Sequence, residues 1–342
     1  MEVEVRLNTN ESPEPPPPEL AAELASIASR LPLHRYPDRS AADLRAAVAA
    51  HHGVAPEQVF CANGSNEVLQ CLLLAYGGSG RQALVFEPTY ALHAHIARLT
   101  GTEVVAGARN AAFEIERAGA LELLAATGPE VVLLCSPNNP TGNTESPETI
   151  ASVAAAADGL VVVDEAYAQF APSSAVALLG DAPNLAVVRT FSKTWALAGL
   201  RLGYLLADPE VAAACAKVAL PYHLDAFKQA AGVAALRHVA EMDARVRRLV
   251  EARRRLVEGL SRLPVDQWPS AANFVLFRPR HMAAAEVWGG LVEASVLVRD
   301  VSSFPGLENC LRVTVGAAEE NRRFLAALGE VLEVGPSVGS PG

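Results

Sequence analysis

"RTFSKTWALAGLRLGY", residues 189–204, runs from the end of one apolar segment to the start of the next. It contains Lys193, one of only three lysines in a chain whose other 25 basic residues are arginines. Because arginine supplies almost all of the ordinary positive charge, Lys193 requires a chemical explanation. The flanking segments, 185–192 and 201–207, are short and apolar, as buried β-strands are.

Five more apolar runs precede this stretch, and alanine- and leucine-rich helical segments separate them. They are "QVFCA" (58–62), "QALVFEP" (82–88), "EVVAG" (103–107), "EVVLLCSP" (130–137) and "GLVVVDEAY" (159–167). Short apolar strands that alternate with helices are typical of a largely parallel sheet with helices on both faces. The sequence therefore predicts an α/β fold for this part of the chain.

The C-terminal third predicts a smaller α+β domain. Residues 241–263 form one long amphipathic, arginine-rich pattern, which indicates a helix with a solvated face of i,i+4 charge pairs. The predicted strands are "ANFVLFRP" (272–279), "SVLVRD" (295–300) and "NCLRVTVG" (309–316). We divide the chain into an N-terminal arm (1–32) that joins the small domain, a large domain (33–237), the small domain (238–334) and a disordered tail (335–342).

Composition narrows the class of protein. The formal net charge of -10 argues against a nucleic-acid or anionic-membrane partner. The N-terminus lacks the pattern of a signal peptide and no window has 18 apolar residues, so we expect a cytoplasmic protein. No cysteine or histidine pair has metal-ligand spacing, so we expect no metal. The scattered cysteines predict buried, reduced thiols: Cys61, Cys71, Cys135, Cys215 and Cys310.

Ligands of such sheets bind beyond the carboxyl ends of the strands, so the residues that end each apolar run are candidates. After the run that ends at residue 62, the turn of Gly64, Ser65 and Asn66 leads into a helix and offers bare N–H groups to an anion. An ordinary helix cap explains this turn equally well.

Two further strand ends carry polar groups. "SPNNPTG" (136–142) combines two prolines with two asparagines, which is more constrained than a generic loop. Asp164 ends a buried strand, where a carboxylate needs a cationic partner, and Tyr167 follows three residues later. The alternative for Asp164 is a cap on the next helix.

One cofactor chemistry accounts for these groups together. Pyridoxal 5'-phosphate needs an amine for its aldehyde, a carboxylate for its ring nitrogen, donors for its ring oxygen, and a helix terminus with a guanidinium for its phosphate. The sequence offers these groups, in the same order, as Lys193, Asp164, the asparagine loop, the Gly-Ser turn and Arg201.

The sequence resembles the fold-type I pyridoxal-phosphate aminotransferases, class II, and within them the histidinol-phosphate aminotransferase family. The resemblance rests on "LNTNESP" (7–13), "RYPD" (35–38), "EPTY" (87–90), "SPNNPTG", "VVVDEAY", residues 189–204, "LPYHLDAFKQAA" (220–231) and "VLVRDVSSFPGLENCLRVTVG" (296–316). It implies a large domain with a mostly parallel seven-stranded sheet, a smaller α+β domain, and a homodimer.

The resemblance also implies roles for cofactor-site residues. Lys193 would bind the cofactor aldehyde and then carry a proton, with its pKa lowered by burial and nearby cations. Asp164 would pair with the ring nitrogen, Asn139 and Tyr167 would donate to the ring oxygen, and Tyr90 would stack on the ring. The phosphate would be held by Gly64, Ser65, Asn66, Ser192, Arg201 and, from the neighbouring subunit, Tyr36.

Substrate contacts follow from the same resemblance. Arg312 would bind the α-carboxylate of glutamate and help to hold histidinol phosphate, and Arg299 would be a second phosphate contact. The arm would close over the site, with Asn10 and Asn139 as further substrate contacts. In some relatives a tyrosine follows the Asn-Glu pair, whereas Ser12 stands in this chain.

The implied reaction is transamination between histidinol phosphate and 2-oxoglutarate, in histidine biosynthesis. The same scaffold also supports aromatic amino-acid aminotransferases and threonine-phosphate decarboxylase, and these alternatives stay open at this stage. A hydrolase built on Ser192 and Lys193 explains neither Asp164 nor the asparagine loop.

Overall fold

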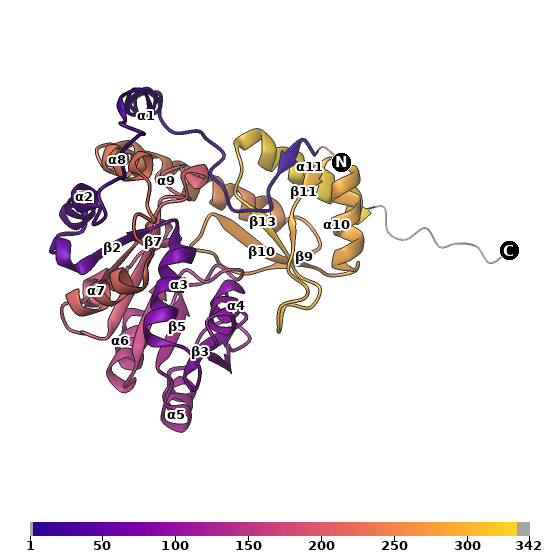
Figure 1. Cartoon of the computed structure of the whole chain (residues 1–342). Coiled ribbons are helices and arrows are strands. Elements are labelled where there is room, and N and C mark those ends of the chain that lie inside the picture. The colour runs from indigo at the N-terminus through magenta and orange to yellow at the C-terminus, as the bar shows by residue number, and fades with distance from the viewer. Residues whose placement is uncertain (1–2, 334–342) are drawn as a thin grey trace.

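The computed structural model describes residues 3–333 of the chain. Two groups of strands lie side by side, and the long helix α9 passes next to both of them (Figure 1). The α-helices are α1 (Pro18–Arg30), α2 (Ala42–His52), α3 (Ser65–Tyr76), α4 (Leu92–Leu99), α5 (Arg117–Thr127), α6 (Pro147–Ala156), α7 (Pro209–Val218), α8 (Ala226–Ala235), α9 (Val239–Leu260), α10 (Ala284–Glu293) and α11 (Ala318–Glu333). Short 3-10 turns cover Pro56–Gln58, Ala168–Phe170, Ala175–Leu178 and Ala198–Leu200.

The larger sheet confirms the predicted mostly parallel, seven-stranded arrangement. Its strands are β2 (Val59–Ala62), β3 (Gln82–Glu87), β4 (Glu103–Ala108), β5 (Val131–Cys135), β6 (Leu160–Asp164), β7 (Leu185–Thr190) and β8 (Gly203–Ala207), in the order β2-β8-β7-β6-β5-β3-β4. Only β8 runs against its neighbours. All seven apolar runs of the sequence became strands.

Successive residues of the central strands face two different hydrophobic cores. Val161 and Val163 of β6 pack with α2, α5, α6 and α8, whereas Leu160 and Val162 pack with α3, α4 and α7. Because both faces are buried, β5, β6 and β7 consist almost entirely of Val, Leu and Ala in their central positions. Their carboxyl ends, including Asp164, therefore reach one common edge of the sheet.

The smaller sheet is antiparallel, with the order β12-β13-β10-β9. Its strands are β9 (Val265–Gln267), β10 (Phe274–Pro279), β12 (Arg299–Asp300) and β13 (Leu311–Thr314). The prediction of one strand at 295–300 was wrong, since the chain changes sheets at Val298. The carbonyl oxygen of this buried residue accepts a hydrogen bond from Trp288 Nε1 at 3.1 Å, so β11 (Val296–Leu297) ends there and β12 begins.

The N-terminal arm connects the two parts of the molecule. Its strand β1 (Val5–Arg6) pairs in parallel with β11 beside the smaller sheet, and the chain then crosses to α1, which packs against α8 (Figure 1). The domain limits at residues 32, 237 and 334 stay predictions, and the tail at 335–342 lies outside the described residues.

All five cysteines are free and buried, as predicted. Within residues 3–333, no helix has the length and apolar character needed to cross a membrane.

Candidate active site

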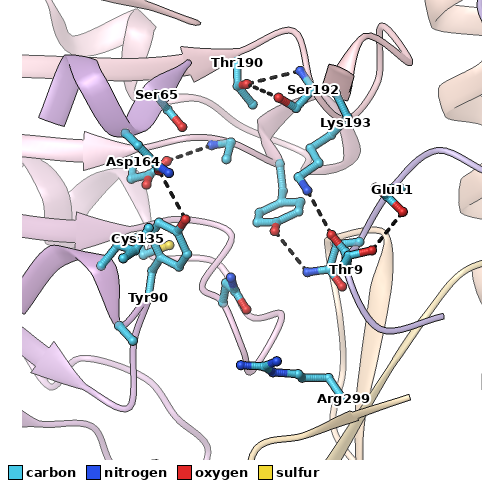
Figure 2. Close-up of a pocket in the computed structure, with 18 of the residues that line it drawn as sticks. Thr9, Glu11, Ser65, Tyr90, Cys135, Asp164, Thr190, Ser192, Lys193 and Arg299 are labelled. Carbon is cyan, nitrogen blue, oxygen red and sulfur yellow. Dashed lines mark hydrogen bonds between the residues drawn. The ribbon is translucent and has the colours of Figure 1, made fainter. Parts of the chain in front are cut away.

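A pocket of about 590 Å³ lies at the carboxyl-end edge of the larger sheet, closed from the other side by the arm and the smaller sheet. Figure 2 shows Asp164, Ser65 and Tyr90 on the left, and Lys193 on the right with Thr9, Glu11 and Arg299. Most of the predicted site residues line this pocket. They are Asn10, Ser65, Asn66, Tyr90, Asn139, Asp164, Tyr167, Ser192, Lys193, Arg201, Arg299 and Arg312.

Lys193 follows β7 and projects into the pocket. Its Nζ donates to the carbonyl oxygen of Thr9 at 3.3 Å (Figure 2). The same nitrogen lies 5.7 Å from the ring centroid of Tyr167. Burial and the nearby Arg312 guanidinium lower the pKa of Lys193 to about 8. The amine is therefore closer to neutrality than an ordinary lysine at physiological pH.

Asp164 ends β6 with its carboxylate buried in the pocket wall. One carboxylate oxygen accepts from the backbone N–H of Ala166 at 3.1 Å, and the other lies 3.2 Å from His93 Nε2. No Lys or Arg of residues 3–333 forms an ion pair with Asp164. The alternative helix-cap role does not account for this histidine contact or for the position of Asp164 at the pocket.

The N-terminus of α3 and the loop after β7 form an anion cradle. Ser65 and Asn66 open the helix, and the Ser192 hydroxyl accepts from Arg201 Nη1 at 3.2 Å. Gly64 precedes the helix with φ +85°, and a Cβ there would lie 2.7 Å from Arg201 Nη2. Helix N–H groups, a hydroxyl and a guanidinium together suit a phosphate.

Tyr90 forms another wall. Its hydroxyl donates to Asn66 Oδ1 at 3.2 Å, and its ring meets the edge of His93 at a centroid distance of 5.5 Å. Burial raises the pKa of Tyr90 to about 12. The phenol is therefore protonated at neutral pH.

Two donor side chains face the pocket from opposite segments. Tyr167 is buried, which raises the pKa of its phenol well above the ordinary value, and its oxygen accepts from Asn10 Nδ2 at 3.0 Å. Asn139 Oδ1 accepts from Arg312 Nη1. Since Arg312 can only donate, the asparagine oxygen must face it, and the amide nitrogen remains available as a donor.

Arg312 and Arg299 are directly opposite each other on β13 and β12. Arg312 is buried, and its guanidinium lies 5.1 Å from the ring centroid of Phe274. Burial lowers the pKa of Arg312 to about 10, and the charge of Arg299 contributes to this shift. Two guanidinium groups on adjacent strands favour an anionic ligand between them.

The arm contacts the site largely through its main chain. The carbonyl oxygens of Asn8 and Thr9 accept from Arg312 and Lys193 at 2.8 and 3.3 Å. Further along, the carbonyl of Pro15 accepts from Arg245 at 2.7 Å, and Arg245 also donates to Thr194 at 3.2 Å. A buried arginine of α9 thus joins the arm to the loop that carries Lys193.

The family model for class I and II aminotransferases matches residues 2–328. A histidinol-phosphate aminotransferase from Frankia casuarinae is 46% identical over 357 aligned positions, which cover 100% of this chain and 88% of the relative. The chain belongs to the histidinol-phosphate aminotransferase family.

Solved structures agree with this assignment. A histidinol-phosphate aminotransferase from Sinorhizobium meliloti, in complex with pyridoxal-5'-phosphate, matches with a TM-score of 0.89 and 26% identity, covering 97% of this chain and 91% of the other. An L-threonine-O-3-phosphate decarboxylase from Porphyromonas gingivalis matches with a TM-score of 0.83 and 26% identity, covering 96% and 99%. The fold alone therefore does not separate the family from this decarboxylase.

Two predicted site residues are not among those that line the pocket: Gly64, which lies beside Arg201 at the cradle, and Tyr36. Tyr36 is 81% exposed and stacks on Tyr222 at a centroid distance of 4.6 Å. The contact of Tyr36 with the site of a neighbouring subunit stays a prediction.

Sequence reasoning missed His93 and Thr190. His93 lies in the first turn of α4, three residues after the predicted site residue Tyr90, and this short distance in sequence was a signal that could have revealed it. Thr190 ends β7 and its hydroxyl donates to Ser192 Oγ at 2.9 Å. It could have been found as the polar last residue of an apolar strand.

Proposed function

We propose that this chain binds pyridoxal 5'-phosphate and catalyses transamination between histidinol phosphate and 2-oxoglutarate, giving imidazole-acetol phosphate and glutamate. The observation that carries the proposal is one pocket in which the Lys193 amine and the Asp164 carboxylate lie beside an anion cradle and a pair of arginines. Family membership supports the same reaction and its place in histidine biosynthesis.

The residues fit this cofactor. Asp164 is a buried carboxylate with a histidine and a backbone N–H as its neighbours, so a protonated ring nitrogen would supply the missing charge partner. Gly64 has no Cβ, and Arg201 can therefore approach the start of α3. Ser65, Asn66 and Ser192 complete a set of donors for a phosphate dianion.

When bound, pyridoxal phosphate supplies an aldehyde for the amino group and a ring that spreads the electrons left behind when the substrate carbon loses its proton. Lys193 would accept that proton at Nζ, for which its pKa of about 8 leaves a usable neutral fraction at neutral pH. Asp164 would hold the proton on the ring nitrogen, and Tyr167 and Asn139 would donate to the ring oxygen.

The two arginines would select anionic substrates. Arg312 would bind the α-carboxylate of glutamate, and Arg299, exposed at the mouth of the pocket, would meet the phosphate of histidinol phosphate. Asn10 and Asn139 line the same space. A planar guanidinium can bind either anion through two parallel hydrogen bonds, which lysine cannot do.

We further propose that the chain works as a homodimer in which Tyr36 of each subunit completes the phosphate site of the other. Tyr36 and Tyr222 stack on the surface, and the neighbouring side chains of Leu33 and Leu220 are 80% and 77% exposed. Exposed aromatic and leucine side chains of this size are typical of a surface that another chain covers. A second copy of this chain would bury all four of them.

A cytoplasmic location is part of the proposal. The five cysteines are free and buried, which suits a reducing compartment, and the proposed reaction belongs to biosynthetic metabolism.

A half-reaction panel tests the proposed function. The cofactor-loaded chain is mixed in turn with histidinol phosphate, glutamate, phenylalanine and O-phosphothreonine, and the cofactor spectrum and products are measured. We expect histidinol phosphate and glutamate to transfer their amino groups and to yield the matching oxo products. Faster transfer from phenylalanine would favour an aromatic aminotransferase. Release of carbon dioxide from O-phosphothreonine would favour a decarboxylase, the activity of a solved structure on the same scaffold.

A further inference from the structure

The hydroxyl group of Tyr167 is in contact with the N-terminal arm. Tyr167 follows β6, and its buried phenol oxygen accepts from Asn10 Nδ2 at 3.0 Å. Asn10 is 2% exposed and has φ +54°, a left-handed conformation that asparagine tolerates better than most residues. Its backbone is held there, since Asn273 Nδ2 donates to its carbonyl at 3.2 Å.

Thr314 at the end of β13 determines which way the Asn10 amide faces. Thr314 Oγ1 accepts from the backbone N–H of Asn10 at 3.0 Å and lies 3.0 Å from Asn10 Oδ1. The Thr314 hydroxyl donates its one proton to Asn10 Oδ1, and within residues 3–333 it donates to no other atom. The amide orientation that uses this proton has the oxygen facing Thr314 and the NH2 facing Tyr167.

This orientation decides what the Tyr167 hydroxyl can do. Because Asn10 donates to its oxygen, the one phenolic proton is not used in that bond. Among residues 3–333, Tyr167 donates to no protein atom, and the neighbouring cation, Arg312, has no lone pair to receive a proton. The proton is therefore free to be donated into the pocket.

We propose that Asn10 and Thr314 are positioning residues that orient the Tyr167 O–H toward the cofactor's ring oxygen. The inference rests on the proposed function, because it assumes pyridoxal phosphate in the pocket. It places three distant segments in one chain of hydrogen bonds, from β13 through the arm to the end of β6. The Tyr167 O–H is then oriented toward the ring oxygen only when the arm and the smaller sheet are both in place.

The test compares Thr314→Val with Thr314→Ser in the cofactor-loaded chain without substrate, by following visible absorbance against pH. A donor to the ring oxygen favours the form in which this oxygen is negative, so its loss raises the midpoint of the absorbance change. We expect Thr314→Val to raise the midpoint by about one pH unit, as Tyr167→Phe should, since one charge-assisted hydrogen bond is affected. Thr314→Ser, which keeps the hydroxyl, should leave the midpoint in place.

A double-mutant cycle separates positioning from a general structural effect. In the Tyr167→Phe background, Thr314→Val should produce no further shift, because the group that it orients is gone. Asn10→Asp is a second probe: its carboxylate would accept the phenolic proton and so withdraw it from the pocket. The effect of its charge alone is measured in the Tyr167→Phe background and subtracted.

A full shift from Thr314→Val in the Tyr167→Phe background would overturn the inference, and so would an unchanged midpoint in Thr314→Val while Tyr167→Phe shifts. Thermal unfolding of each variant shows whether the fold is retained, and Thr314→Ser serves as the folded reference. If the unsubstituted chain gives no visible cofactor band, the proposed function itself fails, and this inference fails with it.

Discussion

The lowered pKa of Lys193 predicts fast capture of the cofactor aldehyde at neutral pH. With a pKa of about 8, about one amine in eleven is neutral at pH 7, compared with about one in three thousand at the ordinary value of 10.5. Only the neutral amine attacks an aldehyde. The cofactor-free chain should therefore capture pyridoxal phosphate at pH 7 about 300-fold faster than an ordinary lysine in the same pocket would.

The substitution Arg312→Gln tests why the pKa of Lys193 is lowered. Burial contributes most to the pKa shift and the Arg312 charge comes next, so removing that charge should raise the pKa of Lys193. We expect the midpoint of the capture rate to move from about pH 8 upward by about one unit, which makes capture at pH 7 about tenfold slower. Arg312→Lys keeps the charge and is the matched control.

The assay is stopped-flow absorbance from pH 6 to 10, with borohydride trapping and peptide mass spectrometry to locate the modified residue. Lys193→Ala gives the background from Lys217 and Lys228. A capture rate that shows no midpoint below pH 10 in the unsubstituted chain would refute the pKa argument. Equal midpoints for Arg312→Gln and Arg312→Lys would show that the guanidinium charge is not part of the cause.

Three other experiments test separate parts of the site. Asp164→Asn should reduce transamination severely with an unchanged circular dichroism spectrum, because the ring nitrogen loses its counter-charge; an unchanged rate would assign that role elsewhere. Mixed dimers of Lys193→Ala and Tyr36→Phe chains should exceed both mutant homodimers in activity at limiting cofactor, since one of their two sites is native, and a fully active monomer in sedimentation would contradict this. Gly203→Ala would place a Cβ 2.4 Å from a backbone nitrogen of the anion cradle, so cofactor affinity should fall at least tenfold by equilibrium dialysis, whereas Gly289→Ala, with open space around it, should be neutral.

The sequence was sufficient to predict the larger sheet and the residues at its carboxyl edge. Asp164 ends one short buried run and Lys193 comes three residues after another, and parallel strands bring the ends of such runs to one edge whatever the lengths of the intervening helices. This is why the cofactor side of the pocket could be predicted without knowledge of tertiary contacts.

The contacts between distant segments could not be predicted in this way. Asn10 and Thr314 are 304 residues apart, and neither hydrophobic periodicity nor turn chemistry reports on a hydrogen bond across such a separation. The change of sheet at Val298 was missed for a similar reason. It depends on the Trp288 indole of α10, which donates to the Val298 carbonyl oxygen. An uninterrupted strand would have used this carbonyl to pair with its neighbour.

The main-chain character of the arm's contacts affects how this enzyme can be studied and how it can change. Lys193, Arg312 and Arg245 all bind carbonyl oxygens of the arm, and any amino acid supplies a carbonyl. Alanine scanning of residues 8, 9 and 15 would leave these three bonds intact and would therefore underestimate the arm. Relatives can differ at these positions while their site electrostatics stay the same, whereas a one-residue deletion would shift every acceptor out of register at once.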